Sequence, residues 1–171
     1  MFIRVISDLK RWGRIAGKES LLPADCFFDI KTNKNTLSLW KVDNTNDRDA
    51  LYQFAVISVL GKNSLSKVTY VLIDENELSH CGLKFQQDDP GCGYISDNNP
   101  SFLNHHFDIL DISHEDFMKI ANIIIGKIEK NEQSIISAKA VYAVAQKLCN
   151  EGIVVKERLQ KSMQECLSKS Q

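Results

Sequence analysis

The chain has 171 residues, which is enough for one compact domain with its own core. Its 21 basic and 22 acidic side chains leave a net charge of -1, which excludes the strong basic field that attracts many proteins to DNA or RNA. The five cysteines have no regular spacing, which argues against a disulfide framework, and no run approaches the roughly 20 apolar residues that cross a bilayer.

The first part of the chain is predicted to contain strands and one helix. An antiparallel hairpin is expected from two apolar runs separated by the polar residues 32–36, which are typical of a turn. Residues 47–60 carry apolar side chains at helical spacing, and residues 68–73 are apolar on both alternating faces, as in a central strand. The predicted strands of this part comprise residues 2–6, 27–31, 37–42 and 68–73.

The second part of the chain is predicted to end in helices. Residues 83–87 and 106–112 are further strand candidates, separated by a loop rich in Asp, Gly, Asn and Pro. Ser113 and Asp116 form the pattern of a capping box, which predicts a helix over residues 113–129. After a polar break at 130–134, helices are expected over 135–150 and 155–169, and together they resemble a helical hairpin.

These elements predict an α+β fold. We expect a mixed β-sheet of about five strands, packed by the helices 47–60 and 113–129, with a C-terminal helical hairpin. The predicted division is a mixed α/β core over residues 1–130 and a hairpin tail over 131–171, within one domain overall. The apolar stripe of the tail must be covered either by this chain or by a partner.

The best candidate for a chemical site is a cluster of histidines in an acidic region. All four histidines and two of the cysteines lie between residues 80 and 114, and residues 88–116 carry seven acidic side chains but no Lys or Arg. In a strand over 105–112, His106 and Asp108 share one face. They are the candidate catalytic residues, and with His80 or His114 they could bind one divalent metal.

The spacing of this cluster does not match a known metal motif. Structural zinc sites use paired ligands two to four residues apart, and the chain has no CxxC or HxxxH. Isolated histidines more often cap helices or lie in loops and cores, so that interpretation is favoured over a metal. Cys92, between Gly91 and Gly93, is a candidate nucleophile, but neighbouring carboxylates should raise the pKa of its thiol and disfavour the thiolate.

No cofactor is expected from the remaining motifs. The segment 13–20 resembles a phosphate-binding loop only superficially, because its glycines are too close together and Glu19 replaces the residue that would hold magnesium. The N-terminus lacks the apolar core and cleavage site of a secretory signal, so we expect a cytoplasmic protein without membrane contact. Both ends of the chain are basic, so a protein that binds nucleic acid through them is a further alternative, and its binding would depend strongly on salt. The balanced overall charge argues against this alternative.

The functional prediction is a non-catalytic protein–protein interaction subunit of a bacterial multi-protein system, with antiviral defence or toxin neutralisation as candidate roles. It follows from the absence of recognised catalytic motifs and from the amphipathic segment 155–169, which would bind another protein chain or a second copy of this one. The alternative is a small metal-dependent hydrolase or nuclease that uses His106 and Asp108 with His80 or His114.

Overall fold

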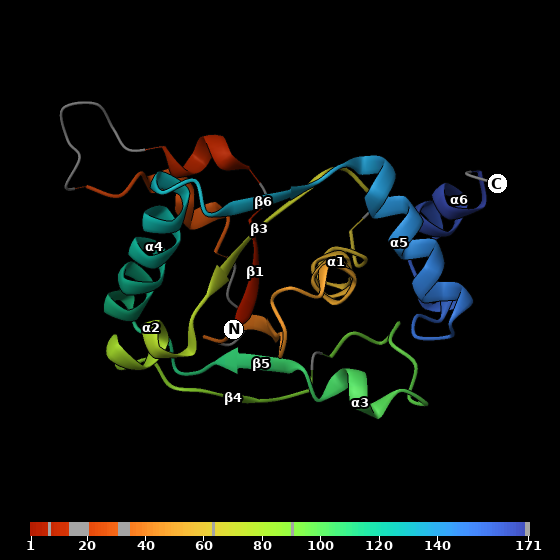
Figure 1. Cartoon of the computed structure of the whole chain (residues 1–171), viewed down its shortest axis with the longest axis horizontal. Coiled ribbons are helices and arrows are strands. Elements are labelled where there is room, and N and C mark those ends of the chain that lie inside the picture. The colour runs from red at the N-terminus through yellow and green to blue at the C-terminus, as the bar shows by residue number, and fades with distance from the viewer. Residues whose placement is uncertain (7, 14–20, 31–34, 63, 90, 170–171) are drawn as a thin grey trace.

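The computed structural model describes residues 1–171 except 7, 14–20, 31–34, 63, 90 and 170–171. The described chain is α+β, as predicted, with one sheet between two layers of helices (Figure 1). Its strands are β1 (Phe2–Ile6), β2 (Leu37–Lys41), β3 (Val68–Ile73), β4 (Phe85–Gln87), β5 (His106–Ile109) and β6 (Gln133–Ile136). Its helices are α1 (Arg48–Ile57), α2 (Glu75–His80), α3 (Pro100–Leu103), α4 (His114–Glu129), α5 (Ala138–Asn150) and α6 (Lys161–Lys169), with short 3-10 helices η1 (Leu9–Trp12), η2 (Ala24–Phe28) and η3 (Lys156–Arg158).

The described sheet has six strands in the order β4-β5-β2-β1-β3-β6, and each pair of neighbours is antiparallel. The prediction of a mixed sheet with about five strands is therefore wrong in both respects. The missed strand is the edge strand β6, which forms within and just after the predicted polar break. Only one of its two isoleucines is buried, since Ile136 is 0% and Ile135 is 51% exposed, so β6 lacks the apolar run that marks a central strand.

The predicted hairpin between residues 27–31 and 37–42 is also wrong. Residues 24–28 form η2, whereas β2 pairs with β1 and β5. Burial explains the difference, because Cys26 and Ile30 are both buried while Phe28 between them is exposed, which is the spacing of a helical turn. The predicted turn at 32–36 lies mostly outside the described residues.

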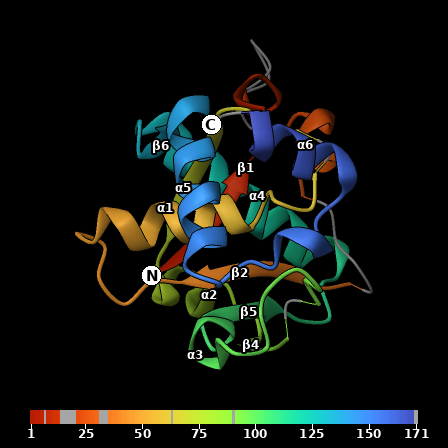
Figure 2. The same cartoon turned by 90° about the vertical axis from the view of Figure 1, so that its right-hand side faces the viewer.

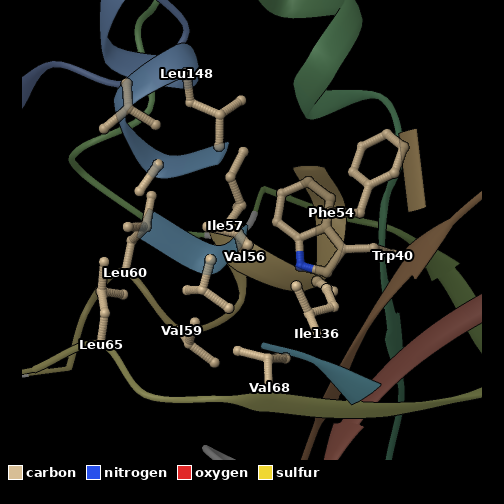
Figure 3. Close-up of a cluster of buried hydrophobic side chains, with 14 of the residues drawn as sticks. Trp40, Phe54, Val56, Ile57, Val59, Leu60, Leu65, Val68, Ile136 and Leu148 are labelled. Atoms are coloured by element: carbon tan, nitrogen blue, oxygen red, sulfur yellow. The ribbon is translucent and has the colours of Figure 1, made fainter. Parts of the chain in front are cut away.

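Each face of the sheet carries its own apolar cluster. On one face, α1 packs on the sheet, α5 packs on α1, and α6 packs on α5 (Figures 1 and 2). Figure 3 shows part of this cluster, in which Trp40 of β2 lies against Phe54 of α1 with ring centroids 5.6 Å apart. On the other face, α2 and α4 cover the sheet together with η1 and η2.

Local sequence signals define several helices correctly. The capping box predicted for α4 is confirmed, since the Ser113 hydroxyl accepts the Asp116 amide while the Asp116 side chain accepts the Ser113 amide. Asp74 and Glu77 make the same kind of capping box for α2, a helix that was not predicted. The pattern in α2 was missed because the helix has six residues, too few for a visible apolar period.

The predicted helix over 155–169 is interrupted. Its first part is η3, and Leu159 is extended before α6 begins. The apolar stripe of this segment is buried in the same cluster as Trp40 and α1, because Leu159, Met163 and Leu167 are 5%, 0% and 3% exposed. The stripe that suggested a partner is therefore covered by this chain.

Candidate binding site

Strand β1 pairs very differently with its two neighbours. Its ladder with β3 has five residue pairs, from Phe2 with Ile73 to Ile6 with Thr69. Its ladder with β2 has only two, Phe2 with Lys41 and Ile3 with Trp40. Beyond these two pairs β1 and β2 no longer form a ladder, and we call this point the strand split.

The side chain of Arg4 spans the strand split. Its guanidinium donates to the backbone oxygen of Ser38 in β2 at 3.1 Å and to the backbone oxygen of Asp29 at 3.3 Å. A guanidinium carries five N–H donors in a fixed plane, so one side chain can bind two strands and keep donors for a further group. Arg4 thus takes the place of the missing backbone ladder.

A cavity of about 310 Å³ lies at the strand split, and we call it the split cavity. Its walls come from β1, β2 and β5, from residues just after α1, from the end of η2, and from the loop before β5. Among the described residues, Phe28, Trp40 and Tyr94 bring aromatic rings to the cavity, and Arg4, Asp29 and Lys62 bring charged groups. The cavity therefore combines apolar and charged walls, which is typical of binding sites.

The charged groups at the split cavity differ in their surroundings and hydrogen bonds. Burial lowers the pKa of Arg4 to about 10, and the nearby Asp29 carboxylate partly opposes this shift, so the guanidinium remains charged at neutral pH. The Asp29 carboxylate is buried and accepts hydrogen bonds from the Trp12 indole at 2.7 Å and the Asp8 amide at 3.3 Å. Lys62 is a second positively charged side chain at the cavity.

The structure brings together two of the four predicted site residues. His106 and Asp108 lie on the same face of β5, opposite Trp40 and Ser38 of β2, and they are 2% and 7% exposed. His106 Nε2 is 3.8 Å from Asp108 Oδ1, and His106 Nδ1 is 2.9 Å from the backbone oxygen of Asp88. Among the described residues, Asp108 Oδ1 is buried without a hydrogen-bond partner.

This geometry limits what His106 can do. Its ring and the Trp40 ring form a T-shaped pair, and both of its nitrogens face oxygen atoms of the protein. A general base needs a nitrogen within hydrogen-bond reach of a substrate proton. In this arrangement His106 forms part of the wall of the split cavity and is poorly placed to act as a catalytic base.

The other two predicted metal ligands do not join this pair. His80 lies at the C-terminal end of α2 and His114 at the start of α4, and both are exposed. Within the described ranges, no group of three or more His, Cys, Asp or Glu side chains is arranged to hold a metal ion. The proposed metal set of His80, His106, Asp108 and His114 therefore receives no support from the geometry.

Cys92 and Tyr94 form a neutral part of the cavity wall. Burial raises the pKa of the Cys92 thiol, and the Asp89 carboxylate raises it further, so the predicted direction was right although burial is the larger cause. Burial also raises the pKa of Tyr94, whose hydroxyl donates to the backbone oxygen of Ile57 at 3.0 Å. Neither group is activated as a nucleophile at neutral pH.

The long loop before β5 is attached to the C-terminal region. Ile95 forms an isolated β-bridge with Val154, and the Val155 amide donates to the backbone oxygen of Tyr94. The Asn99 side chain donates to the backbone oxygen of Gly152 at 3.0 Å. These bonds hold the Cys92 and Tyr94 side of the cavity against the rest of the fold.

The cavity residues that were not predicted from the sequence include Arg4, Phe28 and Lys62. Arg4 had a visible signal, a charged residue in the middle of the apolar strand FIRVI, because charged side chains are rarely buried without a partner. Phe28 was assigned to a strand, and Lys62 follows a helix, where a basic side chain is common.

Among the residues that the structure describes, no helix is both long and apolar enough to cross a membrane. Comparisons of the chain with protein-family models, with curated proteins and with solved structures gave no match.

Proposed function

We propose that the protein is a non-catalytic interaction subunit, and that it recognises a peptide segment of a partner chain at the split cavity. The observation that carries this proposal is Phe28, which is 65% exposed and lines the cavity. A large exposed apolar side chain beside a concave site is typical of a recognition surface rather than of a bare protein surface.

The exposed apolar side chains are unevenly distributed. Four large ones are exposed in the described chain, and three of them, Leu21, Phe27 and Phe28, lie within residues 21–28. The ring of Phe27 also contacts the ring of Phe117 in α4, with their centroids 4.7 Å apart, so this segment is anchored to the helix layer. An anchored segment that presents Phe28 to solvent can bind a partner with little loss of conformational entropy.

The position of the partner differs from the sequence-based expectation. The stripe of the 155–169 segment is buried, so the proposed interface lies at the mouth of the split cavity instead. The bacterial setting, with defence or toxin neutralisation, stays a prediction from the sequence.

A metal-dependent hydrolase is the second candidate, and it is favoured by Asp108 Oδ1, which lies beside His106 and has no hydrogen-bond partner among the described residues. A buried carboxylate oxygen without a partner could bind a cation. Native mass spectrometry in zinc acetate tests this candidate. It predicts one bound ion per chain that is lost in both Asp108→Asn and His106→Gln, and an unchanged mass would contradict it.

The interaction proposal can be tested without a known partner. The immobilised protein would be used to select binders from a phage-displayed library of random peptides. We expect enriched peptides whose binding weakens by about tenfold or more in Phe28→Ser, because the variant removes the exposed apolar contact.

Ile135→Ser is the matched control, since Ile135 is similarly exposed but lies on the edge strand β6. Its binding should equal that of the wild-type protein. The proposal is wrong if no peptide is enriched, or if the enriched peptides bind Phe28→Ser as tightly as the wild-type protein.

A further inference from the structure

We infer that the split cavity binds a carboxylate joined to an apolar group. The inference rests on the proposed function, in which this carboxylate belongs to an acidic residue of the partner peptide that has an apolar neighbour. The geometry of Arg4, its charged neighbours and the position of the apolar side chains support it.

Arg4 is held in a fixed orientation. Among the described residues, its hydrogen-bond partners are the backbone oxygens of Ser38 and Asp29, one for each terminal nitrogen. Two bonds fix the plane of the guanidinium and leave N–H groups of its five-donor fork for a ligand. A planar carboxylate matches such a fork, and bonds between these two charged groups are among the stronger ones in proteins.

The surroundings of Arg4 favour a single negative charge on the ligand. The Asp29 carboxylate lines the cavity beside Arg4. Ser58, the C-terminal cap of α1, also lines the cavity, and the C-terminal end of a helix carries partial negative charge. A carboxylate brings one negative charge to the guanidinium, whereas a phosphate dianion would bring a second one near Asp29 and the helix end.

The apolar walls determine what accompanies the carboxylate. Ile3, Val5 and Trp40 line the cavity on the sheet side, and Phe28 lies at its exposed side. A volume of about 310 Å³ is at the lower end for ligand pockets, so it suits one or two side chains better than a large cofactor. The Cys92 and Tyr94 wall is neutral and places no further charge there.

The test uses a matched pair of small probes, 3-phenylpropanoate and its neutral amide, 3-phenylpropanamide. The two have the same shape, so a difference in affinity reports the charge. Each is titrated into the ¹⁵N-labelled full chain, and the indole N–H signals of Trp40 and Trp12 are followed by NMR. Trp40 lines the cavity, and the Trp12 indole donates to the Asp29 carboxylate in the cavity wall, so both signals report on the site.

We expect 3-phenylpropanoate to shift the Trp40 signal. The amide and inorganic phosphate should bind with an affinity at least about tenfold lower than that of the acid. Arg4→Gln should lose the preference for the acid, while Lys84→Gln, an exposed control, should keep it. The probe pair decides the question in the wild-type protein, so the result does not depend on the folding of the variant.

Three results would overturn the inference. The first is an affinity for the amide within about threefold of that for the acid, and the second is a higher affinity for phosphate than for either probe. The third is a preference for the acid that remains in folded Arg4→Gln. The proposed function fails separately. Binding of the acid with no enriched peptides supports the carboxylate site alone, whereas enriched peptides without Asp, Glu or a required terminal carboxylate support the interaction role alone.

Discussion

The two sides of β1 show how one strand can stabilise a fold on one side and form a site on the other. Toward β3, five consecutive residues of β1 are paired, and the facing residues Val71 and Ile73 are fully buried. Toward β2, pairing ends after two residues and a cavity follows. The difference shows that backbone pairing between β1 and β2 stops at Arg4, whose side chain bonds to the neighbouring strand instead.

The same comparison separates stability from function. A closed ladder with buried side chains has no space for a ligand, and substitutions there disturb packing. At the strand split, polar and charged groups are held by specific bonds, which leaves a cavity that a ligand can fill. Substitutions on the β2 side should therefore change binding more than stability, with one exception, Arg4 itself.

Replacing Arg4 should have the largest effect on stability. Arg4→Met removes two charged hydrogen bonds and leaves the oxygens of Ser38 and Asp29 without this donor, so the free energy of unfolding should fall by about 2 kcal/mol. Urea denaturation followed by circular dichroism measures the change.

Arg48→Met is the matched control for Arg4. Arg48 is exposed and binds only the neighbouring Tyr52 hydroxyl among the described residues, so its replacement should change stability by no more than about 0.5 kcal/mol. Equal effects of the two substitutions would show that Arg4 does not hold the strand split together.

Adding one methylene on each side of β1 tests the difference in packing. Val71→Leu enlarges a fully buried side chain in β3 and should cost about 1–2 kcal/mol, because a well-packed core resists extra volume. Val5→Leu makes the same chemical change at the wall of the split cavity and should cost about 0.5 kcal/mol or less.

Thermal and urea unfolding of both valine variants would provide the comparison. Val5→Leu should also weaken binding of 3-phenylpropanoate, since the new methyl group occupies the cavity. If Val5→Leu is as destabilising as Val71→Leu, the strand split is packed as tightly as the β3 side and leaves no space for a ligand.

The smallest expected effect concerns the Cys92 thiol. Because burial raises its pKa first and Asp89 raises it further, the alkylation of Cys92 should reach half its maximal rate at a higher pH than an exposed small thiol, whose pKa is about 8.5. Asp89→Asn should lower this midpoint slightly. Iodoacetamide labelling at different pH values, read by peptide mass spectrometry with glutathione as the reference thiol, measures it.

The same shift has a consequence for stability. A thiol whose pKa is higher in the folded than in the unfolded chain stabilises the fold fully below the unfolded pKa, and this contribution is lost as the pH rises through the folded pKa. The free energy of unfolding should therefore fall as the pH rises on the alkaline side. This fall should be smaller in Cys92→Ala than in the wild-type protein. A Cys92 midpoint at or below that of glutathione would show that the cavity wall is open to water there.

Local patterns in the sequence predicted the elements that have strong periods. The strands 2–6 and 68–73 match β1 and β3, and the capping box at Ser113 marks the start of α4. The shared face of His106 and Asp108 also followed from alternation in a strand. Short elements such as β6 and α2 were missed, because four to six residues carry too little period to be recognised.

The candidate site depended on long-range contacts instead. Arg4, Phe28, Lys62 and His106 come from four separate parts of the chain, and no spacing between them indicates that they line one cavity. His80 and His114 are close to His106 in sequence but belong to the ends of other helices, so nearness along the chain was misleading.

The sequence by itself determined the α+β class, the main strands and helices, and the pairing of His106 with Asp108 on one face, because these depend on local periods and caps. Only the tertiary structure decided the sheet order, the burial of the C-terminal stripe and the strand split with Arg4 across it. The reason is that each of these depends on which distant segments pack together, and that choice is made by the whole core rather than by any single segment.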